Sequence, residues 1–295
     1  MAEYRSPSGR VMNLPAHMVP PRIKAGYPPL RPSVTTPLTV EPTKFYVEPA
    51  SSETEFLAEL STKAPRIPWD QFLSHHFTWG AGEHIGMVGP TGQGKTTLLL
   101  QILELHRYVT VFATKPRDSS MDWLTVRHGE SAYYKMERWR ALNPDNYPRR
   151  VLWPDASSVH SEKKQAEVFR HAFDSIYREG FWTVAIDELW YICKILGLDR
   201  EIKVFLLQAR SLGISLVCAT QRPAWVPLEV YDQSSHLFFW RDNDETNLKR
   251  IAGLNGGNAA LVRKILPSLD KHHVLYVDNR TGAMVRTKPP KLEGV

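Results

Sequence analysis

One short segment constrains the fold of this 295-residue chain more than any other: residues 89–96 read Gly-Pro-Thr-Gly-Gln-Gly-Lys-Thr. This is the pattern G-x-x-x-x-G-K-[ST] of a phosphate-binding loop (P-loop), whose glycines let successive backbone N–H groups turn toward bound phosphates. Such a loop works between a strand and a helix, which the sequence predicts over residues 84–88 and 95–106. The motif therefore predicts a nucleotide-binding α/β domain.

The loop residues have distinct predicted roles. Lys95 is placed to reach the β- and γ-phosphates, and the hydroxyl of Thr96 to ligate Mg²⁺. The start of the following helix adds partial positive charge. The residues expected to hold the nucleotide are Gly89, Pro90, Thr91, Gly92, Gln93, Gly94, Lys95, Thr96 and Thr97.

A second motif follows 92 residues after Lys95, where an apolar strand over 182–186 ends in Asp187 and Glu188. A carboxylate at the tip of such a strand can hold Mg²⁺, usually through water. A second carboxylate beside it can orient and polarise an attacking water. We therefore predict Asp187 as a Mg²⁺ ligand and Glu188 as the catalytic base.

A third motif closes the strand predicted over 214–219, which ends in Thr220 and Gln221. A parallel sheet would set this tip beside the Asp187 strand, where an amide can sense the γ-phosphate or the attacking water. Strands alternate with helices along the chain, which predicts a mainly parallel sheet flanked by helices. The predicted strands are 84–88, 108–113, 151–153, 182–186, 214–219, 236–240 and 274–277, and the helices are 51–60, 69–77, 95–106, 161–179, 202–212, 246–252 and 259–266, with 114–149 irregular.

The sequence Ala-Thr-Gln-Arg-Pro at 219–223, preceded by Ala-Arg-x-x-Gly-Ile at 209–214, resembles the FtsK/HerA superfamily of DNA-pumping ATPases. The resemblance runs from about Phe77 to about Val277 and includes Phe-Phe-Trp-Arg at 238–241. It implies a RecA-like P-loop NTPase fold of the ASCE type. It also implies an Mg²⁺-dependent ATPase, assembled as a pentameric or hexameric ring, that translocates double-stranded DNA.

The resemblance also suggests roles for single residues. Arg210 is nominated as the arginine that reaches a neighbouring subunit's γ-phosphate, with Arg222 as its rival. Together with Lys95, Glu188 and Gln221, Arg210 completes the predicted catalytic set. One departure stands out: the family often has Asp-Pro-Lys or Asp-Pro-x-Gly after its second strand, whereas this chain has Thr-Lys-Pro-Arg at 114–117. The acid is absent, and whether Lys115 serves a related role is left open.

Composition sets the expected domain boundaries. Residues 1–50 hold ten of the 22 prolines and predict an extended or disordered arm. Residues 51–279 form the predicted ATPase domain, and 280–295 a short basic tail. The net charge of +6 comes from these two ends, since 51–279 is balanced, so we interpret the surplus as solvated tails rather than as evidence for nucleic acid.

Cysteine content and hydropathy indicate the cellular compartment. The only cysteines, Cys193 and Cys218, exclude a disulfide framework and favour a reducing compartment. No apolar run approaches the roughly 18 residues of a membrane span, and no signal peptide is recognised. We expect a cytoplasmic protein, in the host cell if viral, or one associated with the virion.

The absence of an anchor or a winged-helix module in the sequence favours a motor core of the kind found in viral genome-packaging ATPases. The expected partners are double-stranded DNA, further copies of the chain and a portal or membrane docking protein. Two alternatives stay open: a coupling ATPase at a secretion or conjugation pore, and a nucleotide-dependent scaffold.

Overall fold

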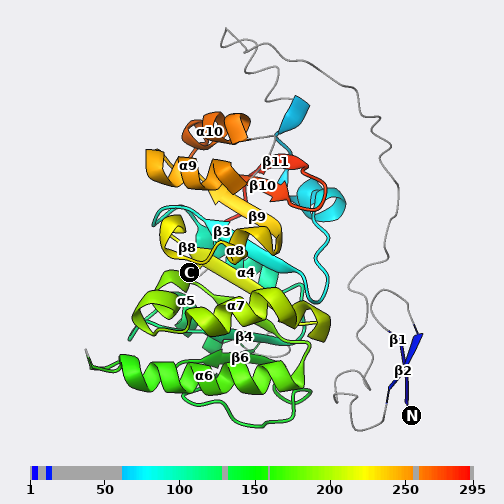
Figure 1. The fold of residues 1–295 in the computed structure, drawn as a ribbon, viewed down its shortest axis with the longest axis vertical. Coiled ribbons are helices and arrows are strands. Elements are labelled where there is room, and N and C mark those ends of the chain that lie inside the picture. Colours follow the sequence, from blue (N-terminus) through cyan, green and yellow to red (C-terminus); the bar gives the residue numbers. More distant parts are fainter. Residues whose placement is uncertain are drawn as a thin grey trace.

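The computed structural model describes residues 2–5, 11–14, 62–127, 132–158, 160–254 and 259–292 (Figure 1). Its centre is a nine-stranded sheet in the order β11-β10-β9-β3-β8-β7-β4-β6-β5. The strands are β3 (His84–Val88), β4 (Val109–Phe112), β5 (Tyr134–Met136), β6 (Arg149–Leu152), β7 (Thr183–Ile186), β8 (Ser215–Thr220), β9 (Ser234–Trp240), β10 (Val274–Asp278) and β11 (Met284–Thr287).

The sheet is parallel from β9 to β5, and β10 and β11 add an antiparallel edge. Every residue of the central strands β3, β4, β7, β8 and β9 is buried. This burial agrees with their nearly continuous apolar sequences, because a parallel sheet is covered on both faces. The predicted mainly parallel α/β fold is confirmed.

Helices cover both faces, and each face has its own apolar core. Phe169 and Phe173 of α6 and Phe205 of α7 belong to one core, which also takes in side chains of α8 to α10. Phe72 and the leucines of α4 belong to the other, with side chains of α5. The helical segments are α3 (Trp69–Gln71), η2 (Phe72–His76), α4 (Lys95–Leu103), α5 (Ser119–Thr125), α6 (Glu162–Glu179), η4 (Tyr191–Ile195), α7 (Asp199–Gln208), η5 (Ala209–Leu212), η6 (Pro223–Trp225), α8 (Glu229–Asp232), α9 (Glu245–Leu254) and α10 (Ala259–Ser268).

Several short elements depart from the sequence-based expectation, and η4, η6 and α8 lie in segments for which no helix was predicted. α5 and β5 lie in the stretch predicted to be irregular, and β11 lies in the predicted basic tail. Asp118 caps the start of α5, since its carboxylate accepts hydrogen bonds from two backbone N–H groups, and α5 buries only Met121 and Leu124. Elements of three to seven residues carry too little periodicity to be recognised. The ladder partner of β11 is β10, and that of β5 is β6, so tertiary pairing defines these strands.

The amino-terminal arm is described only in part. Ala2–Arg5 (β1) and Val11–Leu14 (β2) form an antiparallel pair, and the rest of 1–50 lies outside the described residues. The helix predicted over 51–60 also lies outside them. Within the part of the chain that the structure describes, no helix combines the length and apolar character needed to cross a bilayer.

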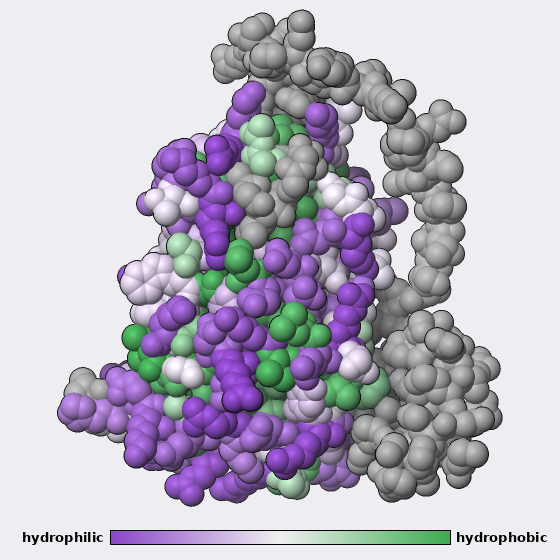
Figure 2. Space-filling view, viewed as in Figure 1, coloured by the Kyte–Doolittle hydropathy of each residue, from purple (hydrophilic) through white to green (hydrophobic). Residues whose placement is uncertain are grey.

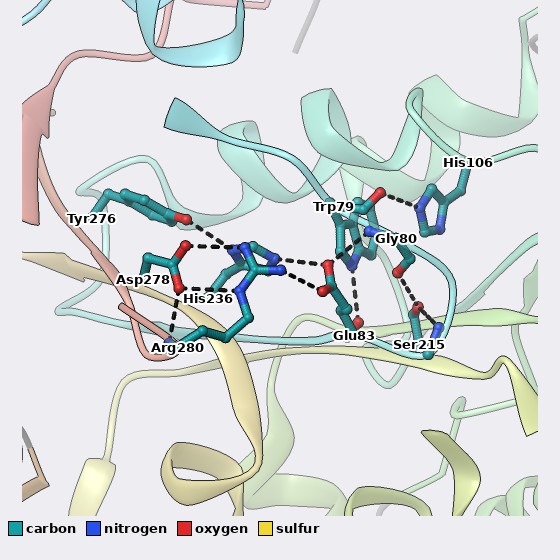
Figure 3. A network of polar contacts seen from close by, with 10 residues as sticks. Trp79, Gly80, Glu83, His106, Ser215, His236, Tyr276, Asp278 and Arg280 are labelled. Atoms are coloured by element: carbon teal, nitrogen blue, oxygen red, sulfur yellow. Dashed lines mark hydrogen bonds and ion pairs between the residues drawn. The ribbon is translucent and has the colours of Figure 1, made fainter. Parts of the chain in front are cut away.

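A polar network surrounds the amino-terminal end of β3 (Figure 3). The P-loop follows the other, carboxyl-terminal end of this strand. Glu83 accepts from the ring of His236 at 3.2 Å and pairs with Arg280, while the other ring nitrogen of His236 contacts the Tyr276 hydroxyl at 2.9 Å. Burial alone would raise the pKa of Glu83, but the hydrogen bonds from His236 and Gly80 and the charge of Arg280 lower it. The ionised Glu83 therefore ties the start of β3 to β9 and to Arg280, two residues beyond the end of β10.

Candidate nucleotide-hydrolysis site

The P-loop joins β3 to α4 as the sequence predicts. Gly92 and Gly94 adopt φ values of +73° and +101°, which side chains other than glycine rarely adopt. Gly89 is required for a different reason: a Cβ there would lie 2.6 Å from Cβ of Trp240, at the end of β9. The loop is thus shaped by its own backbone and by a buried tryptophan beneath it.

Lys95 is buried at the start of α4, and its ammonium donates a hydrogen bond to the carbonyl of Pro90 at 2.8 Å. Burial lowers the pKa of Lys95, and nearby Lys115 lowers it further, while Asp187 and Glu188 act in the opposite direction. The ammonium is therefore held against the loop by a hydrogen bond that a phosphate oxygen can replace.

The parallel sheet brings the three motifs together. β8 lies between β3 and β7, with Val88 paired to Thr220 and Ile186 paired to Cys218. The carboxyl ends of these three strands therefore meet at one edge, which is where ligands bind in open α/β sheets. The residues directly after the strands share that edge, and the predicted neighbourhood of Gln221 and Asp187 is found.

Thr96 and Asp187 form the pair expected to hold Mg²⁺. The Thr96 hydroxyl donates a hydrogen bond to Oδ1 of Asp187 at 2.9 Å. A hydroxyl and a carboxylate are hard oxygen ligands, and Mg²⁺ is commonly bound by one or two protein oxygens together with substrate phosphates and water. The donor set therefore fits Mg²⁺ carried in with a nucleotide.

Glu188 is only 8% exposed, and its two carboxylate oxygens differ. Oε2 accepts a hydrogen bond from Nε2 of Gln221 at 2.6 Å, while the buried Oε1 has no partner among the described residues. Burial and the adjacent Asp187 raise the pKa of Glu188 to about 7, although Lys95 and Gln221 oppose the shift. A carboxylate with this pKa and one unengaged oxygen has the properties of a general base.

Gln221 connects Glu188 to the P-loop. Its amide nitrogen donates to Glu188, and its amide oxygen accepts a hydrogen bond from the hydroxyl of Thr91. Thr91 lies within the loop that would surround the phosphates. A change in the loop on nucleotide binding can therefore reach the carboxylate of Glu188 through one side chain.

The two arginines proposed from the sequence lie at opposite ends of β8: Arg210 before the strand and Arg222 after it. Arg210 belongs to η5, ahead of β8, and its carbonyl lies near Gly82, ahead of β3, so it is not brought into its own chain's site. Arg222 follows Gln221, and its exposed guanidinium lies 5.0 Å and 5.1 Å from the rings of Trp190 and Trp225. Arg222 is therefore at the same end of the sheet as Gln221 and the P-loop, stacked on aromatic rings.

The structure places two further residues at the site: Lys115, whose role the sequence left open, and His272, which the sequence did not assign to it. Lys115 lies 3.6 Å from Oδ2 of Asp187. His272, in the turn before β10, contacts the carbonyl of Gln93 with Nδ1 at 3.3 Å. The position of Lys115 just beyond a predicted strand was a usable signal. The sequence held no comparable signal for His272, because its position beside the P-loop depends on the antiparallel pairing of β10 with β9.

Comparison with known proteins places the fold. No family model and no curated protein matches the sequence. Among solved structures, the fold is that of P-loop NTPases with a mainly parallel sheet. B204, the DNA-packaging ATPase from Sulfolobus turreted icosahedral virus, is similar with a TM-score of 0.52 and 15% identity, over 72% of this chain and 100% of B204. The genome-packaging NTPase B204 from Sulfolobus turreted icosahedral virus 2, in complex with AMPPCP, is similar with a TM-score of 0.52 and 16% identity. The match covers 71% of this chain and 99% of that B204 chain.

The same protein in complex with ATPγS gives a TM-score of 0.50 and 16% identity, over 71% of this chain and 98% of that one. At these identities the likeness establishes the fold. The structural resemblance to viral genome-packaging ATPases that the sequence motifs suggested is confirmed at that level.

Proposed function

We propose that this chain is an Mg²⁺-dependent ATPase that uses hydrolysis to move double-stranded DNA, in the packaging of a viral genome. The observation that carries the proposal is the meeting of five side chains at one sheet edge: Lys95, Thr96, Asp187, Glu188 and Gln221. A site for binding alone would not need a buried carboxylate with a pKa of about 7 beside the metal pair.

Each residue has a step in the proposed cycle. The loop amides and Lys95 bind the phosphates, and Thr96 and Asp187 hold Mg²⁺, which supplies charge neutralisation at the transferring phosphoryl group. Glu188 takes a proton from the attacking water through its unengaged Oε1. Gln221 reports the state of the loop to Glu188 through its two hydrogen bonds.

Assembly into a ring is supported by exposed apolar side chains on the surface. Leu207 of α7, Trp225 of η6 and Leu228 are 56%, 51% and 44% exposed. The face that carries α7 and α8 is otherwise mostly hydrophilic, with separate apolar patches (Figure 2). In the proposed ring, Arg210 or Arg222 of one subunit completes the site of the next.

Duplex DNA as substrate is inferred from the fold. B204 has a fold similar to that of this chain and is described as a DNA-packaging ATPase. Both the resemblance in the 209–223 region and this structural similarity point to the same class of motor.

The direct test is steady-state ATP hydrolysis with and without long double-stranded DNA over a series of salt concentrations. We expect DNA to stimulate turnover, and the stimulation to weaken as salt rises because phosphate contacts are lost. Hydrolysis indifferent to DNA would favour a coupling ATPase at a secretion or conjugation pore. Binding of ATP without turnover would favour a scaffold.

A further inference from the structure

We propose that Lys115 is a second phosphate-binding lysine, whose ammonium contacts the γ-phosphate of the bound nucleotide and so distinguishes a nucleoside triphosphate from a diphosphate. This inference rests on the proposed function only in requiring that the site bind a nucleotide. It extends the site to a fourth strand, β4, on the far side of β7 from the P-loop.

The sheet places Lys115 at the catalytic edge. β4 pairs in parallel with β7, with Phe112 opposite Ile186, and Lys115 follows Phe112 by three residues. Its Nζ lies 3.6 Å from Oδ2 of Asp187, whose Oδ1 accepts from Thr96. The Asp187 carboxylate thus lies between the P-loop threonine and a lysine of another strand.

The backbone of Lys115 is held by the core, whereas its half-exposed side chain is held only by ion pairs with Asp118 and Asp187. The Lys115 carbonyl accepts a hydrogen bond of 2.8 Å from the indole of Trp153, which is buried just after β6. Its ammonium pairs with Asp118 at 3.0 Å, and Asp118 in turn caps the start of α5. The side chain itself is 53% exposed, so it can change partners without disturbing the core.

Electrostatics favours such a change of partner. The ammonium of Lys115 faces two carboxylates, that of Asp118 at 3.0 Å and that of Asp187 at 3.6 Å. Once Asp187 is neutralised by a divalent cation, Lys115 loses part of the attraction that holds it there. The γ-phosphate, which arrives with that cation, is the next anion for its ammonium. A diphosphate offers no such group.

The test compares the affinities of ATPγS and ADP, each with Mg²⁺, by calorimetry for wild type, Lys115→Met and Lys115→Arg. Lys164→Met is a matched control, since Lys164 is also 53% exposed and pairs with one carboxylate, Asp155, at 3.5 Å. We expect Lys115→Met to weaken ATPγS roughly 10- to 100-fold, the range for a hydrogen bond to a charged group, and ADP by less than about twofold. Lys115→Arg should retain most of the ATPγS affinity, and Lys164→Met all of it.

An unchanged ratio of the two affinities in Lys115→Met would overturn the proposal, and so would equal losses for both nucleotides. If Lys115→Met fails to fold, Lys115→Gln gives the same comparison with a polar head group. A wild type that binds ATPγS but does not turn over ATP would refute the motor function and leave this test intact. A wild type that binds neither nucleotide would refute both.

Discussion

The side-chain amide of Gln221 donates a hydrogen bond of 2.6 Å to the carboxylate of Glu188, across the tips of two neighbouring parallel strands. The same amide accepts from Thr91 of the P-loop. Glu188 is therefore already held in place, and the one side chain that holds it also contacts the loop that would surround the phosphates.

Replacing Glu188 by Gln should preserve nucleotide binding and lower turnover at least about 100-fold, because a neutral amide cannot take the proton of the attacking water. The affinity for ATPγS and the steady-state rate are the two measurements. Glu245→Gln, a change on the exposed face of α9, is the control. Turnover close to that of wild type in Glu188→Gln would assign the base elsewhere.

Replacing Gln221 by Ala should lower turnover about 10- to 100-fold with little change in ADP affinity, since it frees both Glu188 and Thr91 without touching Lys95. Single-turnover hydrolysis measures the effect on chemistry alone. Gln208→Ala removes an exposed amide that accepts from Tyr177 and should keep full activity. A loss of ADP affinity matching the loss of rate would reduce Gln221 to a structural support of the loop.

The two arginines can be separated by mixing subunits. Lys95→Ala subunits lack phosphate binding but keep both arginines, so mixing them with Arg210→Ala subunits should restore activity at interfaces that combine one intact site with one intact arginine. The same experiment with Arg222→Ala tests the rival. Activity that never exceeds simple dilution for one arginine argues against a role in trans for it.

Gly89→Ala should destabilise the protein by about 1–3 kcal/mol, because the added Cβ would meet Trp240 at 2.6 Å in a closely packed region. Urea unfolding measures the loss. Gly80→Ala is the matched control just ahead of the same strand, where the nearest atom would be 3.7 Å away. Equal stability of the two variants would contradict the prediction, because it would show that Trp240 can shift at little cost in free energy.

Acid should destabilise the fold between pH 6.5 and 4. Burial lowers the pKa of His106 to about 4 from 6.5, so in this window the unfolded chain binds more protons and stability falls as pH falls. His106 alone contributes a loss of about 2 kcal/mol between pH 7 and pH 5. His106→Gln should lose correspondingly less over that interval, whereas His160→Gln, which alters an exposed residue, should behave as wild type.

The features of this protein that depend on neighbouring residues could be predicted from the amino-acid sequence. The P-loop is recognisable from eight consecutive residues, because the positive φ values of Gly92 and Gly94 and the start of the helix are local features. Only the need for glycine at position 89 comes from a distant residue, Trp240. The strands that end in Asp187 and Gln221 were recognisable for a similar reason: strands buried on both faces have continuous apolar sequences. Their meeting at one edge followed from the parallel alternation of strands and helices.

Features that depend on pairing between distant segments could not be predicted in this way. β5 and β11 are strands because they pair with β6 and β10. Three or four residues are too few to show an alternation of apolar and polar side chains. Lys115 reaches Asp187 because β4 and β7 are neighbours, although many residues separate them in sequence. The raised pKa of Glu188 likewise arises from burial and an adjacent charge, which only the folded chain creates.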